Sequence, residues 1–121
     1  MELSILEESQ YHKYHKDEKR CLTSDEINLL KCLFDASGHT FNIDIITVHE
    51  MNDGDMGSLY FPMKEKKYSD RMFGKCIIEK TFLDEDGMPI SVALNVDKEG
   101  ILYELDIWRV DFQPLKRYPR C

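Results

Sequence analysis

Carboxylates gather in the most apolar part of this sequence. In the stretch "ELDIWRVDF", Glu104 and Asp106 stand two residues apart among large apolar side chains, and Asp111 follows them. Residues two apart share one face of a β-strand, so a rise of about 3.3 Å per residue would separate the first two carboxylates by about 7 Å. Such a pair can act as acid and base in hydrolysis, hold a metal ion, or attract a basic partner. The pattern is equally typical of the solvated face of a sheet.

A second acidic group lies in "NDGDMGS", residues 52–58, which contains Asp53 and Asp55. A calcium loop would need a glutamate at a fixed distance further on, and a phosphate loop would need a lysine and a following helix. Neither follows here, so we interpret this segment as a turn whose glycines adopt positive φ. Asp53 and Asp55 remain candidates for a second acidic patch.

No other group of residues forms a recognised catalytic or metal-binding pattern. His12 and His15 are spaced to share a helix face, but with Cys21 they supply three ligands, whereas a structural zinc site needs four. The sequence contains neither a G-x-S-x-G motif nor a Rossmann glycine fingerprint. We therefore predict no catalytic residues, no metal ion and no cofactor.

The four cysteines, at positions 21, 32, 76 and 121, show no C-x-x-C spacing. Because the N-terminus does not resemble an export signal and no apolar run approaches the roughly 20 residues that span a bilayer, we expect a soluble, cytoplasmic protein. Reduced thiols are the expectation for that compartment.

A helix over about residues 23–36 is the most clearly patterned element. Thr23 and Glu26 match the T-x-x-E capping box, in which each side chain satisfies a free amide of the first turn. Gly38 then ends the helix. Between these signals, apolar residues recur at helical spacing, at Ile27, Leu30 and Phe34.

Five later segments read as strands: 41–51, 58–63, 74–84, 88–96 and 101–112. Turn sequences such as "DEDG" and "DKEG" connect the last three, and connections this short imply antiparallel neighbours. We therefore predict an α+β fold, with one main N-terminal helix packed on an antiparallel, mostly meandering sheet of about five strands. Residues 21–121 would form a single domain, and residues 1–20 a polar arm that is helical or mobile.

The alternation of apolar residues changes phase near the end of the chain. Up to Ile107 the apolar residues occupy odd positions, including Tyr103, whereas Trp108, Val110 and Phe112 occupy even ones. A period of two cannot change phase in an ordinary half-buried strand without exposing one set. Either a β-bulge near 107–108 restores one buried face, or the strand carries a small apolar cluster on its second face.

The chain has a formal net charge of −7, which bears on the class of partner. An acidic body repels nucleic acid, whose binding depends on lysine and arginine, and it favours basic proteins. The last residues run the other way, with Lys116, Arg117 and Arg120. We expect this tail to fold back on acidic neighbours, and we predict neither nucleic-acid nor membrane binding.

Three stretches resemble a family of small uncharacterised bacterial domains: "MNDGDMGSL" (51–59, pattern MxDGxMGSL), "FG" (73–74) and "ELDIWRVDFQPL" (104–115). The resemblance covers about the second half of the chain and implies no catalytic residues. Small acidic α+β proteins of this kind are similar to immunity proteins of bacterial toxin systems.

The leading hypothesis is therefore a non-enzymatic immunity protein that neutralises a basic cognate toxin by direct binding. Candidate contact residues are Glu104, Asp106 and Asp111, with Asp53 and Asp55 as a second patch; Trp108 and Tyr103 are candidate aromatic anchors. Two alternatives stay open. One is a small metal-dependent hydrolase that uses Asp53, Asp55 and Asp106, and the other is a structural or regulatory subunit whose acidity serves solubility.

Overall fold

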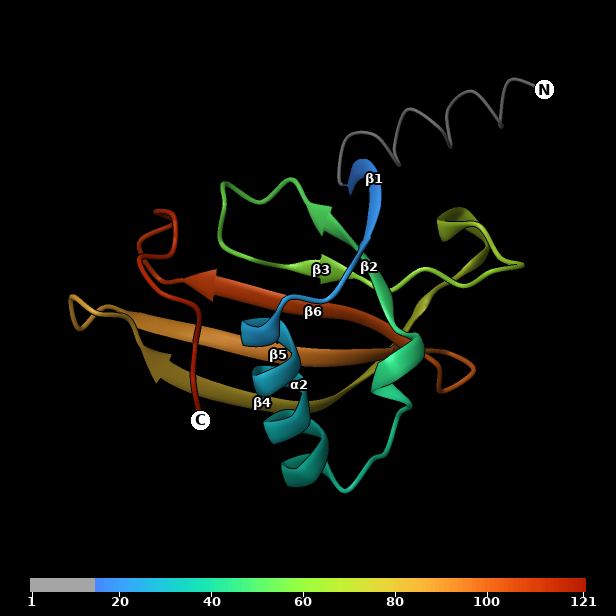
Figure 1. Ribbon diagram of the computed structural model, residues 1–121, viewed down its shortest axis with the longest axis horizontal. Helices are drawn as coiled ribbons and strands as arrows, with labels where there is room; N and C mark the ends of the chain where they lie inside the picture. Colours follow the sequence, from blue (N-terminus) through green and yellow to red (C-terminus); the bar gives the residue numbers. More distant parts are fainter. Residues whose placement is uncertain (1–14) are drawn as a thin grey trace.

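The computed structural model describes residues 15–121, so most of the predicted polar arm lies outside the described residues. One α-helix lies against one face of a sheet whose far edges are β1 and β4 (Figure 1). The described elements are β1 (His15–Cys21), α2 (Ser24–Ser37), η1 (Ile43–Ile45), β2 (Thr47–Met51), β3 (Leu59–Tyr60), η2 (Tyr68–Asp70), β4 (Phe73–Leu83), β5 (Pro89–Asp97) and β6 (Leu102–Arg109).

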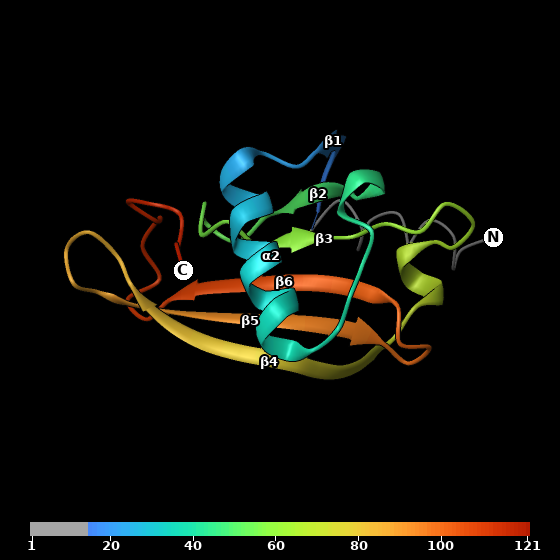
Figure 2. The ribbon, with the colours of Figure 1, turned by 60° about the horizontal axis from the view of Figure 1, so that its bottom comes forward.

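The predicted helix is confirmed to within one residue at each end. The Thr23 hydroxyl accepts a hydrogen bond from the Glu26 amide at 3.2 Å, and the Glu26 carboxylate accepts one from the Thr23 amide at 2.8 Å. Gly38 ends the helix in the left-handed conformation, with φ 75°. The buried face of α2 packs against the sheet (Figure 2) through Leu29, Leu30, Leu33 and Phe34.

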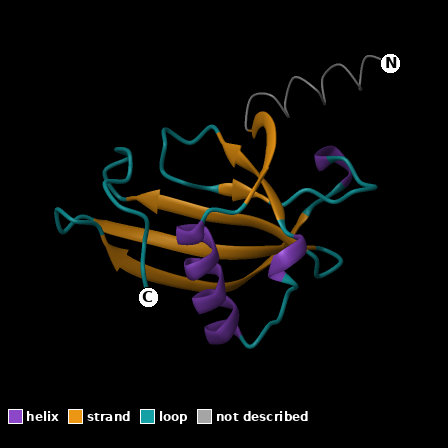
Figure 3. Ribbon diagram, viewed as in Figure 1, coloured by secondary structure: helices purple, strands orange, loops and turns teal. Residues whose placement is uncertain are grey.

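The predicted five-stranded meander is wrong in two respects. Within residues 15–121 the sheet has six antiparallel strands, in the order β1-β2-β3-β6-β5-β4 (Figure 3). The additional strand is β1, which the sequence hides because its residues are polar and do not alternate. The chain also does not meander throughout, because residues 61–72 carry it from β3 to the far edge, and β6 returns between β3 and β5.

Two predicted strands are shorter than expected. Residues 43–45 form a turn of 3-10 helix, so the strand predicted over 41–51 begins at Thr47. The strand predicted over 58–63 contains only Leu59 and Tyr60, consistent with the missing amide of Pro62. The predictions for β4, β5 and β6 are close to the observed bounds.

The phase change in β6 does not come from a bulge at residues 107–108. Pairing with β5 is continuous from Asp106 to Arg109, and the irregularity in this ladder lies opposite Tyr103 instead. Ile107 is buried in the core on the α2 side, and Arg109 takes the next position on that side. Trp108 therefore points to the opposite face, as the second of the two predicted explanations requires.

The C-terminal segment turns back to the α2 side of the sheet, as Figure 1 shows. Leu115 and Tyr118 pack against the core, and Cys121 forms a disulfide with Cys32 of α2, with the two Cα atoms 6.3 Å apart. The expectation of reduced thiols is contradicted at this pair, because the fold brings together two cysteines that are 89 residues apart. Cys21 and Cys76 are free and exposed. No described helix is long and apolar enough to cross a membrane.

We expect the disulfide to lower the number of reactive thiols and to raise the free energy of unfolding. Protein purified without reductant should show two reactive thiols, from Cys21 and Cys76, and four after reduction. A Cys32→Ser variant should unfold more easily by about 2–4 kcal/mol, because its unfolded chain is no longer closed into a loop. Thiol titration and urea melts measure both quantities, with Cys76→Ser as the control. Four reactive thiols in the native protein would contradict the pairing.

Candidate binding surface

The buried guanidinium of Arg109 organises one end of the sheet. It donates to both carboxylate oxygens of Asp111, at 2.8 and 2.6 Å, and to both of Asp86, at 3.1 and 3.0 Å. A fifth hydrogen bond, of 2.9 Å, goes to Asp84. Asp84 and Asp86 belong to the β4–β5 hairpin and Asp111 follows β6, so one arginine joins the ends of three strands. We call these four residues the Arg109 cluster.

Asp84 extends the Arg109 cluster to the C-terminal segment. Its carboxylate accepts hydrogen bonds from the backbone amides of Lys116, at 2.8 Å, and Arg117, at 3.0 Å. Burial acts to raise the pKa of Asp84, but these amides and Arg109 outweigh it, and the pKa lies below its usual value. The basic tail does fold back on acidic neighbours, as predicted: Lys116 and Arg117 use their backbone amides, and the Arg120 side chain lies 4.0 Å from Asp25 of α2.

Asp111, a predicted contact residue, is bound within the chain. Its hydrogen bonds with Arg109 lower its pKa to about 2, and its Oδ1 also accepts the Gln113 amide at 3.1 Å. The carboxylate is thus committed to holding the turn that follows β6. Asp111 therefore differs from Glu104 and Asp106, which do not bind Arg109.

Glu104 and Asp106 lie on the sheet face that points away from α2. Each is partly buried, and Asp106 accepts a 2.8 Å hydrogen bond from the side-chain amide of Asn95 on β5. Burial, reinforced by the charge of Asp106, raises the pKa of Glu104 to about 7. Burial also raises the pKa of Asp106, against the Asn95 hydrogen bond, and the charge of Asp53 contributes in the same direction. Glu104, Asp106 and Asp53 are therefore close enough for their charges to influence one another.

The predicted turn at residues 52–58 is confirmed. Gly54 and Gly57 adopt φ of 75° and 91°. The Asp53 carboxylate accepts the backbone amides of Met56, at 3.1 Å, and Ser58, at 2.9 Å. Asp53 thus folds the loop from within, as aspartate commonly does in turns.

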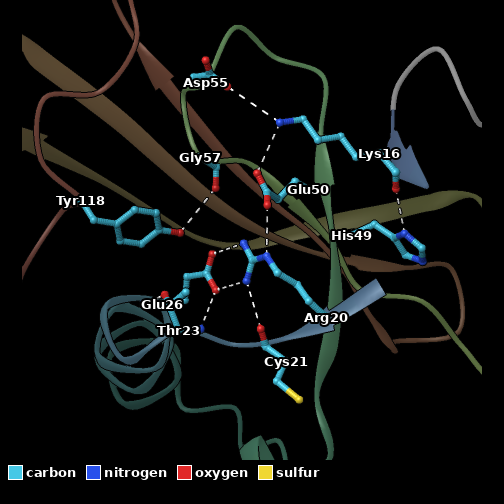
Figure 4. Close-up of polar contacts among 10 residues, drawn as sticks. All are labelled: Lys16, Arg20, Cys21, Thr23, Glu26, His49, Glu50, Asp55, Gly57 and Tyr118. Atoms are coloured by element: carbon cyan, nitrogen blue, oxygen red, sulfur yellow. Dashed lines mark hydrogen bonds and ion pairs between the residues drawn. The ribbon is translucent and has the colours of Figure 1, made fainter. Parts of the chain in front are cut away.

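Asp55 points to a different neighbour (Figure 4). Its exposed carboxylate lies 3.9 Å from Lys16 of β1, and Lys16 is 3.5 Å from Glu50 of β2. Glu50 also pairs with Arg20 at 3.1 Å, which lowers the pKa of Glu50. The predicted second patch therefore divides, because Asp53 binds the amides of its own loop and Asp55 lies near Lys16 of β1.

Arg20 in turn connects β1 to the start of α2. Its guanidinium donates to both oxygens of Glu26, each at 2.8 Å, so the capping glutamate also anchors the strand (Figure 4). Tyr118 enters the same region from the C-terminal segment, and its hydroxyl donates to the Gly57 carbonyl at 3.4 Å.

The two predicted aromatic anchors have different environments. Tyr103 is buried, stacks against Tyr68 at 6.0 Å between ring centroids, and lies beneath the Arg71 guanidinium at 4.9 Å. Trp108 is 47 % exposed, and its ring stacks with that of Phe112 at 6.1 Å and 22°. Tyr103 thus packs within the fold, whereas Trp108 is exposed at the surface.

Trp108 belongs to the small apolar cluster that the phase change offered as its second explanation. Leu83, Val110 and Phe112 are 69 %, 43 % and 68 % exposed. Pairing places Leu83 opposite Pro89, whose carbonyl accepts the Val110 amide, so these residues continue the face that holds Trp108. The phase change indicated Trp108, Val110 and Phe112, whereas Leu83 was not predicted, because it comes from β4 and joins the cluster only through strand pairing. We call Leu83, Trp108, Val110 and Phe112 the aromatic platform.

The two longer stretches that carry the family resemblance pack against each other. The Ser58 hydroxyl donates to the Ile107 carbonyl at 3.0 Å and accepts the Ile107 amide at 2.9 Å. A Cβ added at Gly57 would lie 3.0 Å from the Tyr118 ring and 3.3 Å from Leu115. The motif residues at these positions therefore have a structural role at the junction of the loop with β6.

No group of three or more histidine, cysteine, aspartate or glutamate side chains that could hold a metal ion occurs within the part of the chain that the structure describes. In particular, Asp53, Asp55 and Asp106 do not form such a group.

The profile of a protein family matches residues 19–119, nearly the whole described chain. The chain therefore belongs to this family, which is described as a domain of unknown function (DUF6984). No curated protein and no solved structure shows a significant match.

The Arg109 cluster predicts a defined loss of stability in acid. An Arg109→Met variant leaves three carboxylates without their cation, so it should melt well below the native protein at pH 7. The pKa of Asp111 is lowered to about 2, so this stabilisation is present above about pH 4 and is lost as the pH falls through 2. The difference in melting temperature should shrink over that window. Arg120→Met, at an exposed arginine, serves as the control.

Glu104 predicts the opposite pH dependence. Its pKa is raised to about 7 from an ordinary 4.5, so the folded state holds the proton more tightly and loses stability as the pH rises between these values. Glu104→Gln should therefore be more stable than the native protein at pH 8, by about 2 kcal/mol after allowance for solvent screening. At pH 4 the two should be nearly equal. Urea melts at both pH values provide the measurement, with the exposed Glu79→Gln as control, and equal stabilities at pH 8 would refute the assignment.

Proposed function

We propose that this chain is a non-enzymatic binding protein, an immunity protein that neutralises a cognate bacterial toxin by direct contact with a basic surface. The observation that carries the proposal is the sheet face opposite α2, where partly buried Glu104 and Asp106 stand in line with exposed Trp108 on one strand. Enrichment of aromatic residues and desolvated polar groups is characteristic of protein interfaces.

The charge distribution on this face supports a basic partner. Between Glu79 and Leu83 of β4, the residues on this face and those paired with them include two acids, and none of them is a lysine or an arginine. They stand in three cross-strand rows: Glu79, Ala93 and Asp106; Thr81, Ser91 and Trp108; and Leu83, Pro89 and Val110. Toxins that act on nucleic acids must carry positive clefts to bind phosphate, and a carboxylate face accelerates encounter with such a cleft.

The raised pKa of Glu104 suits a surface that changes charge on binding. Its pKa of about 7 lets this carboxyl gain or lose a proton close to neutral pH. A partner cation placed beside it favours the ionised form, so binding would release a proton and strengthen as the pH rises from 6 to 8.

The proposed site of action is the cytoplasm. Because reductants there keep thiols reduced, the Cys32–Cys121 disulfide would persist in the cytoplasm only if the fold shields it from them. The binding face lies on the side of the sheet away from this pair.

Affinity capture from the native cells tests the proposal. The tagged protein should retain one basic protein at low salt, and retention should be lost in Glu104→Lys/Asp106→Lys. The matched control is Asp35→Lys/Asp44→Lys, which changes the net charge equally at exposed positions outside this face. Glu104→Gln/Asp106→Asn, whose melting is checked first, separates loss of the surface from loss of folding. Inhibition of the captured protein's toxicity by the native chain completes the test, and equal capture by both lysine variants would sink the idea.

A further inference from the structure

The aromatic platform is a large exposed apolar surface on a chain that is otherwise rich in charge. Its residues are 43–69 % exposed, and they continue along one face across β4 and β6. Scattered single apolar residues on a surface need no explanation, but a contiguous apolar patch usually marks an interaction site. Trp108 and Phe112 stack with ring centroids 6.1 Å apart, so the patch presents a paired aromatic surface.

The platform is held rigid from below. Phe112 has φ 60°, a left-handed conformation that bulky residues rarely adopt, and its amide donates to the Arg109 carbonyl at 2.9 Å. The same Arg109 side chain binds Asp111, so the turn that carries Phe112 is fixed at two points. A surface that is already ordered loses little conformational freedom when it binds.

The surroundings of the platform are negatively charged. Asp106 lies on the same strand face two residues before Trp108, about 7 Å away along the strand. Beneath the platform, the Arg109 cluster holds three carboxylates and one guanidinium, so it carries two net negative charges. The C-terminal segment passes to the α2 side, as Figure 1 shows; its Arg117 and Arg120 line a hollow with Leu83 at the edge of the platform, but Trp108 and Phe112 do not line it. An occupant must therefore combine positive charge with a surface that can stack on aromatic rings.

Resting on the proposed function, we propose that the platform receives an arginine side chain from a loop of the protein partner, with its guanidinium stacked on Trp108 and paired with Asp106. Arginine fits this geometry better than lysine, because its planar guanidinium stacks on aromatic faces and binds carboxylates through two parallel hydrogen bonds. Leu83 and Val110 provide apolar contact for the methylene stem and for neighbouring residues of the loop.

Trp108 is the single tryptophan of the chain, so it reports on this contact directly. The probes are two synthetic octapeptides, acetyl-GRGRGRGR-amide and acetyl-GKGKGKGK-amide, which carry equal charge. Titration is followed by tryptophan fluorescence and by the one indole N–H signal in NMR spectra of the full chain. We expect the arginine peptide to bind at least threefold more tightly than the lysine peptide, and to shift the indole signal.

Three variants separate stacking from charge. Phe112→Gly removes the stacked ring at a position with positive φ, which glycine adopts readily, so folding is preserved. This variant should bind the arginine peptide at least fivefold more weakly. Asp106→Asn should weaken it by a similar factor. The control is Ile45→Ser, which removes another exposed apolar side chain, 76 % exposed, outside the platform; binding should be unchanged.

The inference is overturned if the arginine peptide leaves the indole signal in place, or if both peptides bind equally and Phe112→Gly has no effect. It is also overturned if sedimentation shows that native chains self-associate and that Phe112→Gly abolishes this association, because the occupant is then a second copy. Capture of a basic partner that depends on Glu104 and Asp106 while Trp108 stays unperturbed would leave the proposed function standing and remove this inference. If the arginine peptide binds selectively at Trp108 but no partner is captured, this inference would stand and the proposed function would lose its support.

Discussion

The constraint on which this structure depends is the placement of a full positive charge at a core-side position of β6. A buried guanidinium is costly unless carboxylates surround it with good geometry. Arg109 obtains them from both sides, from the β4–β5 hairpin and from the turn after β6. The hairpin, the last strand and the C-terminal segment therefore have to assemble together, because none of these carboxylates is matched by another side-chain cation at this end of the described sheet.

This arrangement separates two groups of carboxylates on and around β6. Asp84, Asp86 and Asp111 have lowered pKa values and belong to the fold, since they hold the cation that joins three strands. Glu104 and Asp106 have raised pKa values and remain on the opposite face. Carboxylates that look alike in the stretch "ELDIWRVDF" thus differ because Glu104 and Asp106 lie within β6 and face away from α2, whereas Asp111 lies in the turn after β6 and binds Arg109. The acidity of the chain is partly internal structure and partly available surface.

Local signals identified the elements that local chemistry controls. The capping box placed α2, and the strand predicted over 88–96 corresponds to β5, because both depend on neighbours within a few residues. The polar strand β1 and the insertion of β6 beside β3 depend on pairing across tens of residues, and no local pattern reports them. Arg109 did offer a local signal, because a charged residue at a core-side position beside a phase change indicates a buried ion cluster. Its partners Asp84 and Asp86 could not be predicted in this way, since they lie more than 20 positions earlier in the sequence.

The disulfide between α2 and the last residue has a mechanical consequence. It closes the chain into a covalent ring from Cys32 to Cys121, which contains β2 to β6 and leaves β1 outside. A pulling force on the C-terminus would pass through the sulfur bridge directly into α2, without loading the strands between them. An unfolding machine that pulls the oxidised chain at Cys121 must therefore draw in two lengths of polypeptide at once, because the disulfide keeps α2 joined to the segment being pulled.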